Sequence, residues 1–143
     1  MIGFLVALFS GALMSVQGVF NTQVTKTTGV WVSSGWVQLS AFAVCLILWF
    51  ATGRDHVAEL LEVEPRYMLL GGVLGAGITW TVIVSMSMLG PAKAALLIVV
   101  AQVLCAYLIE LMGMFGVEKQ PINIWKVVGM AFAVLGLVIF ENQ

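Results

Sequence analysis

The chain has 143 residues, of which 62% are hydrophobic and only 9% are charged, and its net charge is −1. Soluble domains carry about 25% charged residues, so this composition excludes an ordinary soluble domain. The lack of excess basic charge also argues against a nucleic-acid-binding protein. Apolar stretches long enough to cross a bilayer as helices occur at residues 2–24, 30–52, 67–89, 92–115 and 122–140.

These stretches are continuously apolar, whereas the strands of a membrane β-barrel are about 10 residues long and alternate in polarity. Helices are the other structure that satisfies every backbone hydrogen bond in lipid. The sequence therefore predicts an all-α integral membrane protein with five transmembrane helices, forming a single membrane domain over residues 1–143. No basic residue precedes Lys26, so we expect the first stretch to belong to the mature protein rather than to a signal peptide.

The first stretch becomes polar toward its end, where Gln17 and Asn21 lie four residues apart and share one helix face. Gly11 and Gly18 belong to an adjacent stripe of small residues, which allows a second helix to approach closely. Gln17 and Asn21 can line a polar cavity, or they can form hydrogen bonds between helices. Both interpretations stay open at this point.

Tryptophans lie within the next two stretches, Trp36 in the second and Trp80 in the third. A tryptophan inside a span can face a cationic or aromatic substrate, although packing is its commoner role. No histidine cluster, nucleophile–base pair or metal-ligand spacing is present. The sequence therefore predicts neither an enzyme nor a bound cofactor or metal.

The fourth stretch contains Gln102 and Glu110, which are eight residues apart and therefore share one helix face. A carboxylate at membrane depth is costly, which makes Glu110 the candidate proton- or cation-binding residue. Gln102 falls near the midpoint of the stretch, and Glu110 lies about 10 Å beyond it. The alternative is that Glu110 lies near the helix end, where headgroups hydrate it or a lysine pairs with it.

The distribution of basic residues gives a weak indication of topology. The positive-inside rule favours a cytoplasmic amino terminus, because four basic residues fall on that side of the predicted spans and two on the other. The four are Arg54, Arg66, Lys119 and Lys126, and the two are Lys26 and Lys93.

An odd number of spans cannot contain an internal inverted repeat, whereas many transporters bind substrate between two inverted halves. The chain could therefore be one half of a ten-helix assembly, either an antiparallel homodimer or a heterodimer with a homologous chain. In an antiparallel dimer, Glu110 of one chain would share a leaflet with Gln17 and Asn21 of the other. A non-transporting membrane subunit that requires a homologous partner is the alternative.

Several short motifs follow one another in a characteristic order. They are Gly11 with Gln17-Gly-Val-Phe-Asn21, Gly71-Gly-Val-Leu-Gly75, Gly90-Pro-Ala-Lys-Ala94, Gln102 with an acid eight residues later, and Gly113-x-x-Gly116. In order and spacing the sequence resembles the YdcZ-like inner-membrane exporters of the drug/metabolite transporter superfamily, over nearly the whole chain. Two departures are Ala101, where the family usually has glycine, and Leu111, where it usually has histidine.

The resemblance implies a small secondary-active exporter in the bacterial inner membrane, which moves a small metabolite or cation across the lipid bilayer in exchange for protons. Glu110 would bind the proton or cation, and Gln17, Asn21 and Gln102 would supply neutral hydrogen bonds. Trp36 and Trp80 would stack on the substrate. The related small multidrug resistance transporters use a glutamate in their first span, but no acid precedes Asp55 here, so their mechanism does not transfer directly.

Overall fold

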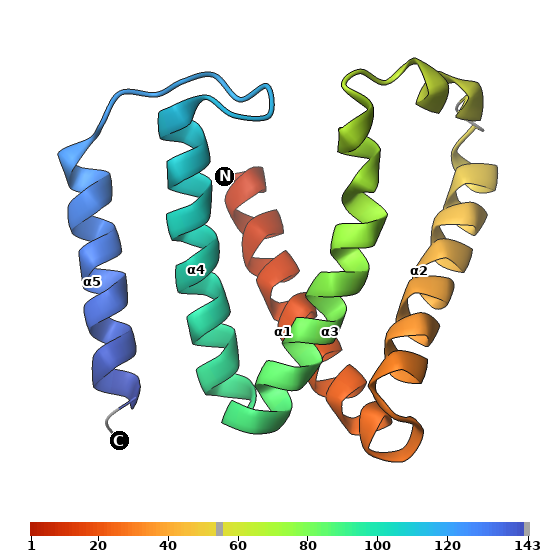
Figure 1. Ribbon diagram of the computed structural model, residues 1–143, viewed down its shortest axis with the longest axis horizontal. Coiled ribbons are helices and arrows are strands. Elements are labelled where there is room, and N and C mark those ends of the chain that lie inside the picture. The colour runs from red at the N-terminus through yellow and green to blue at the C-terminus, as the bar shows by residue number, and fades with distance from the viewer. Residues whose placement is uncertain (54–55, 142–143) are drawn as a thin grey trace. The chain divides into compact units, whose positions relative to one another are not determined.

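The computed structural model describes residues 1–53 and 56–141, and every regular element in these ranges is a helix (Figure 1). All five long helices have the length and hydropathy of membrane spans. The predicted architecture of five long apolar helices is therefore confirmed. In chain order the elements are α1 (Ile2–Thr28), α2 (Val30–Thr52), η1 (Val57–Glu62), η2 (Arg66–Leu70), α3 (Gly71–Leu89), α4 (Pro91–Met112) and α5 (Ile124–Glu141).

Two helix ends differ from the predicted stretches because of glycines in the left-handed region. α1 continues to Thr28 and stops where Gly29 adopts φ 85°, a conformation that other residues rarely take. α4 stops at Met112 rather than 115, because Gly113 adopts φ 65° and ψ 41° and donates its N–H to the carbonyl of Ile109. Glu110 therefore lies in the last turn of α4, about 3 Å from its end.

The chain divides into two compact units, Met1–Met88 and Leu89–Gln143, which we call unit 1 and unit 2. Unit 1 contains α1, α2, η1, η2 and nearly all of α3. Unit 2 contains α4, α5 and the loop that joins them. Arg54, which entered the predicted topology, lies outside the described residues.

The buried part of unit 1 is built from small and polar residues. Gly18 faces Met86 so closely that a Cβ added at residue 18 would lie 2.6 Å from the Met86 methyl carbon. The end of the Met86 side chain on α3 therefore lies against α1 at Gly18, because residue 18 has no side chain to exclude it. The buried residues of the three helices are Gly18, Thr22, Ser33, Ser34, Ile83 and Met86.

Hydrogen bonds link α2 to both of its neighbours in unit 1. The Ser33 hydroxyl donates to the backbone carbonyl of Asn21 on α1 at 3.1 Å. The Gln38 amide donates to the Thr79 hydroxyl on α3 at 3.2 Å. In contrast, the buried Ser34 hydroxyl has no hydrogen-bond partner within the described part of the chain. Polar side chains thus serve as contacts between helices in this unit, as is common in membranes.

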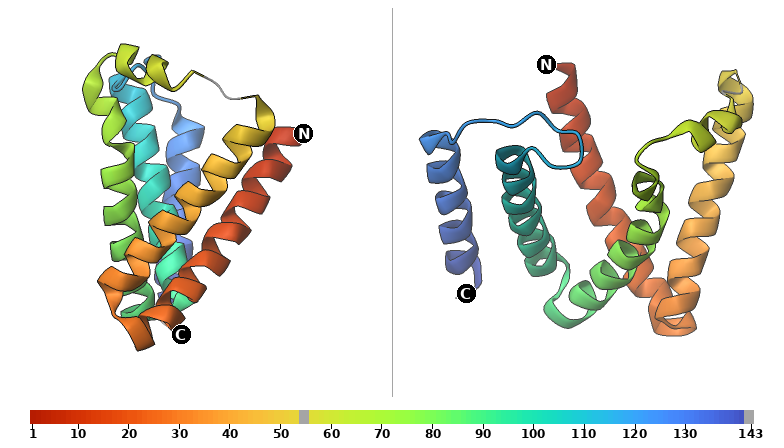
Figure 2. Two further views of the ribbon diagram at one scale, coloured as in Figure 1. Left: turned by 90° about the vertical axis from the view of Figure 1, so that its right-hand side faces the viewer. Right: turned by 45° about the horizontal axis from the view of Figure 1, so that its top comes forward.

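Unit 2 is a helical hairpin. α4 and α5 lie side by side and antiparallel, and a loop over residues 113–123 connects them (Figures 1 and 2). No residue of α5 is buried.

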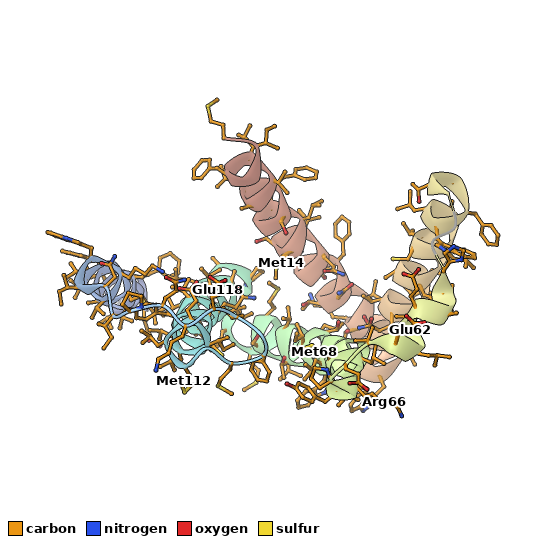
Figure 3. All side chains as sticks on the ribbon, turned by 90° about the horizontal axis from the view of Figure 1, so that it is seen from above. Met14, Glu62, Arg66, Met68, Met112 and Glu118 are labelled. Atoms are coloured by element: carbon orange, nitrogen blue, oxygen red, sulfur yellow. The ribbon has the colours of Figure 1, made fainter. Side chains whose placement is uncertain are left out.

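Apolar side chains cover the outer surfaces of the long helices in both units. Met14 on α1 and Met112 on α4, for example, are both exposed (Figure 3). An apolar surface of this kind suits helices surrounded by lipid or by other membrane helices, because lipid tails are themselves apolar.

Candidate functional site

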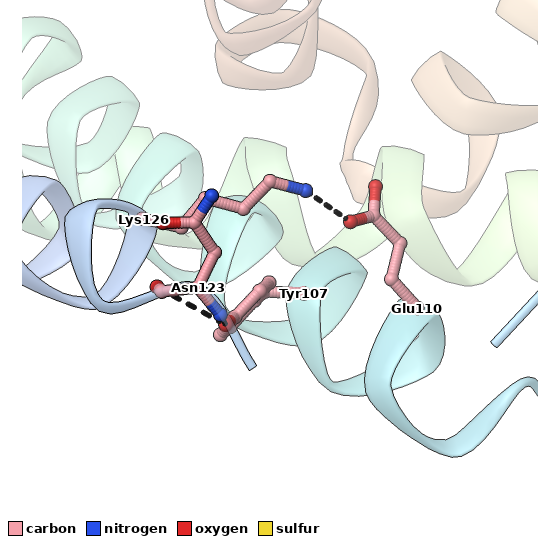
Figure 4. A network of polar contacts seen from close by, with 4 residues as sticks. All are labelled: Tyr107, Glu110, Asn123 and Lys126. Atoms are coloured by element: carbon pink, nitrogen blue, oxygen red, sulfur yellow. Dashed lines mark hydrogen bonds and ion pairs between the residues drawn. The ribbon is translucent and has the colours of Figure 1, made fainter. Parts of the chain in front are cut away.

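Glu110 pairs with Lys126 across the α4–α5 hairpin. The lysine Nζ lies 2.8 Å from the carboxylate Oε2, and 49% of the lysine side chain and 39% of the glutamate side chain are exposed (Figure 4). Lys126 lies in the first turn of α5, so the pair joins the end of one helix to the start of the next. The same ammonium lies 5.6 Å from the centre of the Tyr107 ring, within the range of a cation–π contact.

A second ion pair joins the opposite end of the hairpin. Lys93, near the start of α4, lies 2.8 Å from the Glu141 carboxylate at the end of α5. Each of the four charges lies at the unfavourable end of its own helix dipole but beside the favourable end of the neighbouring helix. The charges therefore favour an antiparallel pairing of α4 with α5.

The spacing of the two pairs places them near the two membrane faces. Glu110 lies 17 residues after Lys93, and Glu141 lies 15 residues after Lys126, which corresponds to about 22–26 Å along the helix axes. This distance approaches the ~30 Å thickness of the hydrocarbon core. No acidic or basic residue lies between the charges on either helix. The Glu110–Lys126 pair thus lies at one end of an uncharged hairpin.

The loop between α4 and α5 holds this end of the hairpin in place. The Gln120 N–H donates to the backbone carbonyl of Glu110 at 2.9 Å, so the loop folds back onto the last turn of α4. A Cβ added at Gly113 would lie 3.0 Å from the Lys119 Cβ, so this return also favours a residue without a side chain. Glycine at 113 therefore suits the site in both conformation and size.

Asn123 caps α5 and links it to α4. Its side-chain oxygen accepts the Trp125 N–H at 2.9 Å. Its own N–H donates to the Tyr107 hydroxyl at 3.1 Å (Figure 4). An asparagine at this position satisfies a free N–H of the first helical turn. The Tyr107–Asn123 contact thereby fixes the register of the first turn of α5, which carries Lys126.

A groove of about 350 Å³ lies between the facing sides of α4 and α5. Glu110, Lys126 and Tyr107 form its polar end. The remaining lining residues are apolar or small, namely Val103, Ala106, Gly129, Met130 and Ala133. A groove of this size, with a few polar groups at one end of an apolar wall, has the general character of a small-molecule site. In the part of the chain that the structure describes, no group of three or more His, Cys, Asp or Glu residues could hold a metal ion.

Comparison with known proteins assigns the chain to a family. Residues 2–139 match the model of the family described as "Putative inner membrane exporter, YdcZ". The chain belongs to this family. No curated protein and no solved structure matches it. Family membership, together with the five long apolar helices, makes this a multi-pass membrane protein of a transport family rather than of an enzyme family.

In this YdcZ family member, the six predicted site residues do not form one cluster within either unit. In unit 2, Gln102 is exposed and does not line the groove that contains Glu110. In unit 1, Gln17 is exposed and Asn21 is half-buried. Among the described residues, the side-chain amides of Gln17, Asn21 and Gln102 form no hydrogen bond. Their predicted roles as binding groups stay predictions.

The two predicted tryptophans, Trp36 and Trp80, have different surroundings in unit 1. Trp80 stacks on Trp31, with ring centres 6.1 Å apart and ring planes 9° from parallel. Trp36 is 63% exposed. The stack links the start of α2 to α3, so Trp80 has a packing role in unit 1.

Lys126, Tyr107 and Asn123 are the residues of this site that sequence reasoning did not assign to it. The sequence suggested a lysine partner for Glu110 only as an alternative, and the structure provides one in Lys126. The sequence did contain a feature that indicates this lysine partner. Each helix of the hairpin carries one charge near each end, and an antiparallel arrangement pairs these charges crosswise.

Proposed function

We propose that the chain is a small secondary-active exporter in which Glu110 exchanges its lysine partner for a proton or a cation. The observation that carries this proposal is the position, exposure and pairing of the Glu110 carboxylate. Glu110 lies at the mouth of a groove, its side chain is 39% exposed, and its ion-pair partner in the described residues is Lys126. Because exposed ion pairs contribute little stability, a proton or a cationic group can displace the lysine at low cost.

We further propose that the two units form one membrane domain and that two chains work together as an antiparallel dimer. The unpaired Gln102 amide supports a partner, because it lies at the midpoint of α4. A polar group without a hydrogen bond is costly in hydrocarbon, so a second chain or a polar cavity is expected to cover it.

The depths of the polar residues favour the antiparallel arrangement. With the observed helix bounds, Glu110 lies about 13 Å beyond the midpoint of α4, and Asn21 lies about 9 Å beyond the midpoint of α1. α1 and α4 cross the membrane in opposite directions, because two crossings, α2 and α3, lie between them. Glu110 of one chain therefore shares a leaflet with Gln17 and Asn21 of an inverted partner, where these groups would form the substrate site.

Transport measurements on the purified chain in proteoliposomes test the role of Glu110. We expect Glu110→Gln to abolish proton-coupled export while the protein still folds and inserts. Glu141→Gln is the matched control, because Glu141 forms an equally short pair with Lys93 but does not line the groove. If Glu110→Gln retains pH-dependent transport, Glu110 is not the coupling group. If the wild-type chain transports nothing without a homologous partner, it is a subunit rather than a complete exporter.

Crosslinking tests the antiparallel dimer. Cys45 and Cys105 are free and exposed, so both are first replaced by alanine. Single cysteines at positions 17 and 110, placed on separate chains, should then crosslink with each other in membranes. Crosslinks that form only between like positions on parallel chains would contradict the antiparallel arrangement.

A further inference from the structure

The α4–α5 groove is amphipathic along its length. Its polar end carries Glu110 and Lys126, and its walls continue along both helices toward the hairpin centre as far as Val103 and Ala133. Each wall extends seven residues from the ion pair, or about 10 Å along the helix axis. A ligand that fills this groove therefore has a charged group at the helix ends and an apolar chain directed toward the middle of the hairpin.

The ion pair at the polar end retains binding capacity for a second pair of charges. An ammonium group has three donors, and a carboxylate accepts several hydrogen bonds, whereas Glu110 and Lys126 form one bond with each other. Both side chains are also partly exposed. A ligand that presents one anion and one hydrogen-bonding cation matches this arrangement, with its anion on Lys126 and its cation on Glu110.

The apolar part of the groove is open because residue 129 is glycine. A Cβ added at Gly129 would meet no atom within 4 Å, so the missing side chain leaves space that α4 does not fill. Gly136, on nearly the same face of α5 two turns later, is equally unobstructed but does not line the groove. These two glycines therefore offer a matched comparison between filling the groove and altering the same helix outside it.

We propose that this groove binds a zwitterionic phospholipid with a primary-amine headgroup. The lipid ammonium contacts Glu110, the phosphate contacts Lys126, and the beginning of one acyl chain lies along the apolar walls. The location of the charges at the end of an uncharged hairpin matches the depth of headgroups in a leaflet. This inference rests on the proposed function in one respect, since it names a cation that binds Glu110, the carboxylate that the exporter proposal assigns to proton or cation binding.

The amine chemistry sets the expected lipid preference. A primary ammonium donates charge-assisted hydrogen bonds to a carboxylate, which are stronger than neutral ones. A quaternary ammonium has no N–H to donate, and the glycerol headgroup of phosphatidylglycerol offers Glu110 only neutral hydroxyl donors. Phosphatidylethanolamine should therefore bind more tightly than phosphatidylcholine or phosphatidylglycerol with the same acyl chains.

Native mass spectrometry of the full chain, delipidated in detergent and mixed with these three lipids, tests the preference. We expect phosphatidylethanolamine to be retained about tenfold more tightly than phosphatidylcholine, as the loss of charge-assisted hydrogen bonds predicts. Glu110→Gln should remove this preference, whereas Lys126→Gln should weaken the retention of all three lipids alike, because each of them carries the phosphate that Lys126 contacts. Glu141→Gln and Lys93→Gln break the other ion pair of the same hairpin and should leave the preference intact.

Filling the groove gives a second, independent readout. Gly129→Leu should abolish lipid retention, whereas Gly136→Leu should preserve it. Equal retention of all three lipids by the wild type, or equal retention by the two leucine variants, would overturn the proposal. If Gly129→Leu dissociates an oligomer and leaves lipid retention unchanged, a second chain rather than a lipid occupies the groove.

Binding and export can fail separately in these experiments, because lipid retention is measured without transport. If the wild type shows no headgroup preference but Glu110→Gln still abolishes coupled export, the lipid site is wrong and the exporter proposal stands. If the headgroup preference is present but Glu110→Gln exports normally, the lipid site stands and the coupling role of Glu110 is wrong.

Discussion

The helices inside unit 1 and the helices inside unit 2 are joined by different kinds of contact. In unit 1, Gly18 admits Met86, and the Ser33 hydroxyl links α2 to α1. In unit 2, α4 and α5 are joined by an ion pair at each end of the hairpin. A groove lies between the two helices next to the Glu110–Lys126 pair. Close packing should therefore matter most for the stability of unit 1, whereas in unit 2 the charges mainly set how α4 and α5 lie opposite each other.

This difference has a physical basis in the membrane. Close contact between small residues works at any depth, because it requires no water and no charge. Ion pairs are far less costly near the membrane faces than in the hydrocarbon core, so they occupy helix ends. Charges that mark both ends of a hairpin also fix which residues of the two helices lie opposite each other.

The largest expected effect is overpacking in unit 1. Gly18→Leu should lower the free energy of unfolding by roughly 1–3 kcal/mol, because the new side chain collides with Met86 and displaces its buried thioether end. Unfolding in detergent with increasing dodecyl sulfate, followed by circular dichroism, measures this change. Gly11→Leu is the control, since a Cβ there meets no atom within 4 Å. Equal losses in the two variants would mean that the Gly18–Met86 contact does not determine the stability of unit 1.

The sequence was sufficient to predict the five long helices, but it predicted less of the candidate site. Continuous hydropathy identifies the five long helices, because lipid leaves few alternatives for an apolar run of this length. The end of α4 was misplaced by three residues, because hydropathy continues through Met114 and Phe115 whereas the backbone turns at Gly113. This small difference moves Glu110 from within the predicted span to the last turn of its helix.

Contacts between helices were the least predictable part of the site. Periodicity places Glu110 and Gln102 on one face, but it does not say which residue of α5 lies opposite. That register depends on the loop, through the Gln120–Glu110 backbone bond and the Tyr107–Asn123 contact. Tryptophan spacing likewise could not show that Trp80 would stack on Trp31.

A smaller effect is expected from two neighbouring serines of α2. Ser33→Ala should destabilise unit 1 by roughly 0.6–1 kcal/mol, because it removes the hydrogen bond to the Asn21 carbonyl on α1. Ser34→Ala removes a buried hydroxyl that has no partner among the described residues, so it should be neutral or stabilising. The same detergent unfolding measurement compares the two variants. If Ser34→Ala is the more damaging change, its hydroxyl has a partner outside the described chain, such as a second copy.

The smallest expected effect concerns the Glu110–Lys126 pair, because partly exposed ion pairs contribute little to stability. Glu110→Lys places two ammonium groups opposite each other and should lower the unfolding midpoint of the chain. Adding Lys126→Glu in the same chain restores an opposite pair with reversed polarity, and the midpoint should recover.

The reversed pair separates two explanations for the hairpin charges. In the double variant, each charge lies at the favourable end of its own helix dipole, whereas in the wild type each lies at the unfavourable end. The exchange also leaves the count of basic residues on each membrane face unchanged, so topology is not altered. A midpoint at or above that of the wild type would show that pairing across the hairpin is what the charges contribute to stability. If the double variant remains as destabilised as the single variant, the wild-type polarity itself is required, which is the result expected when each charge interacts mainly with the dipole of the neighbouring helix.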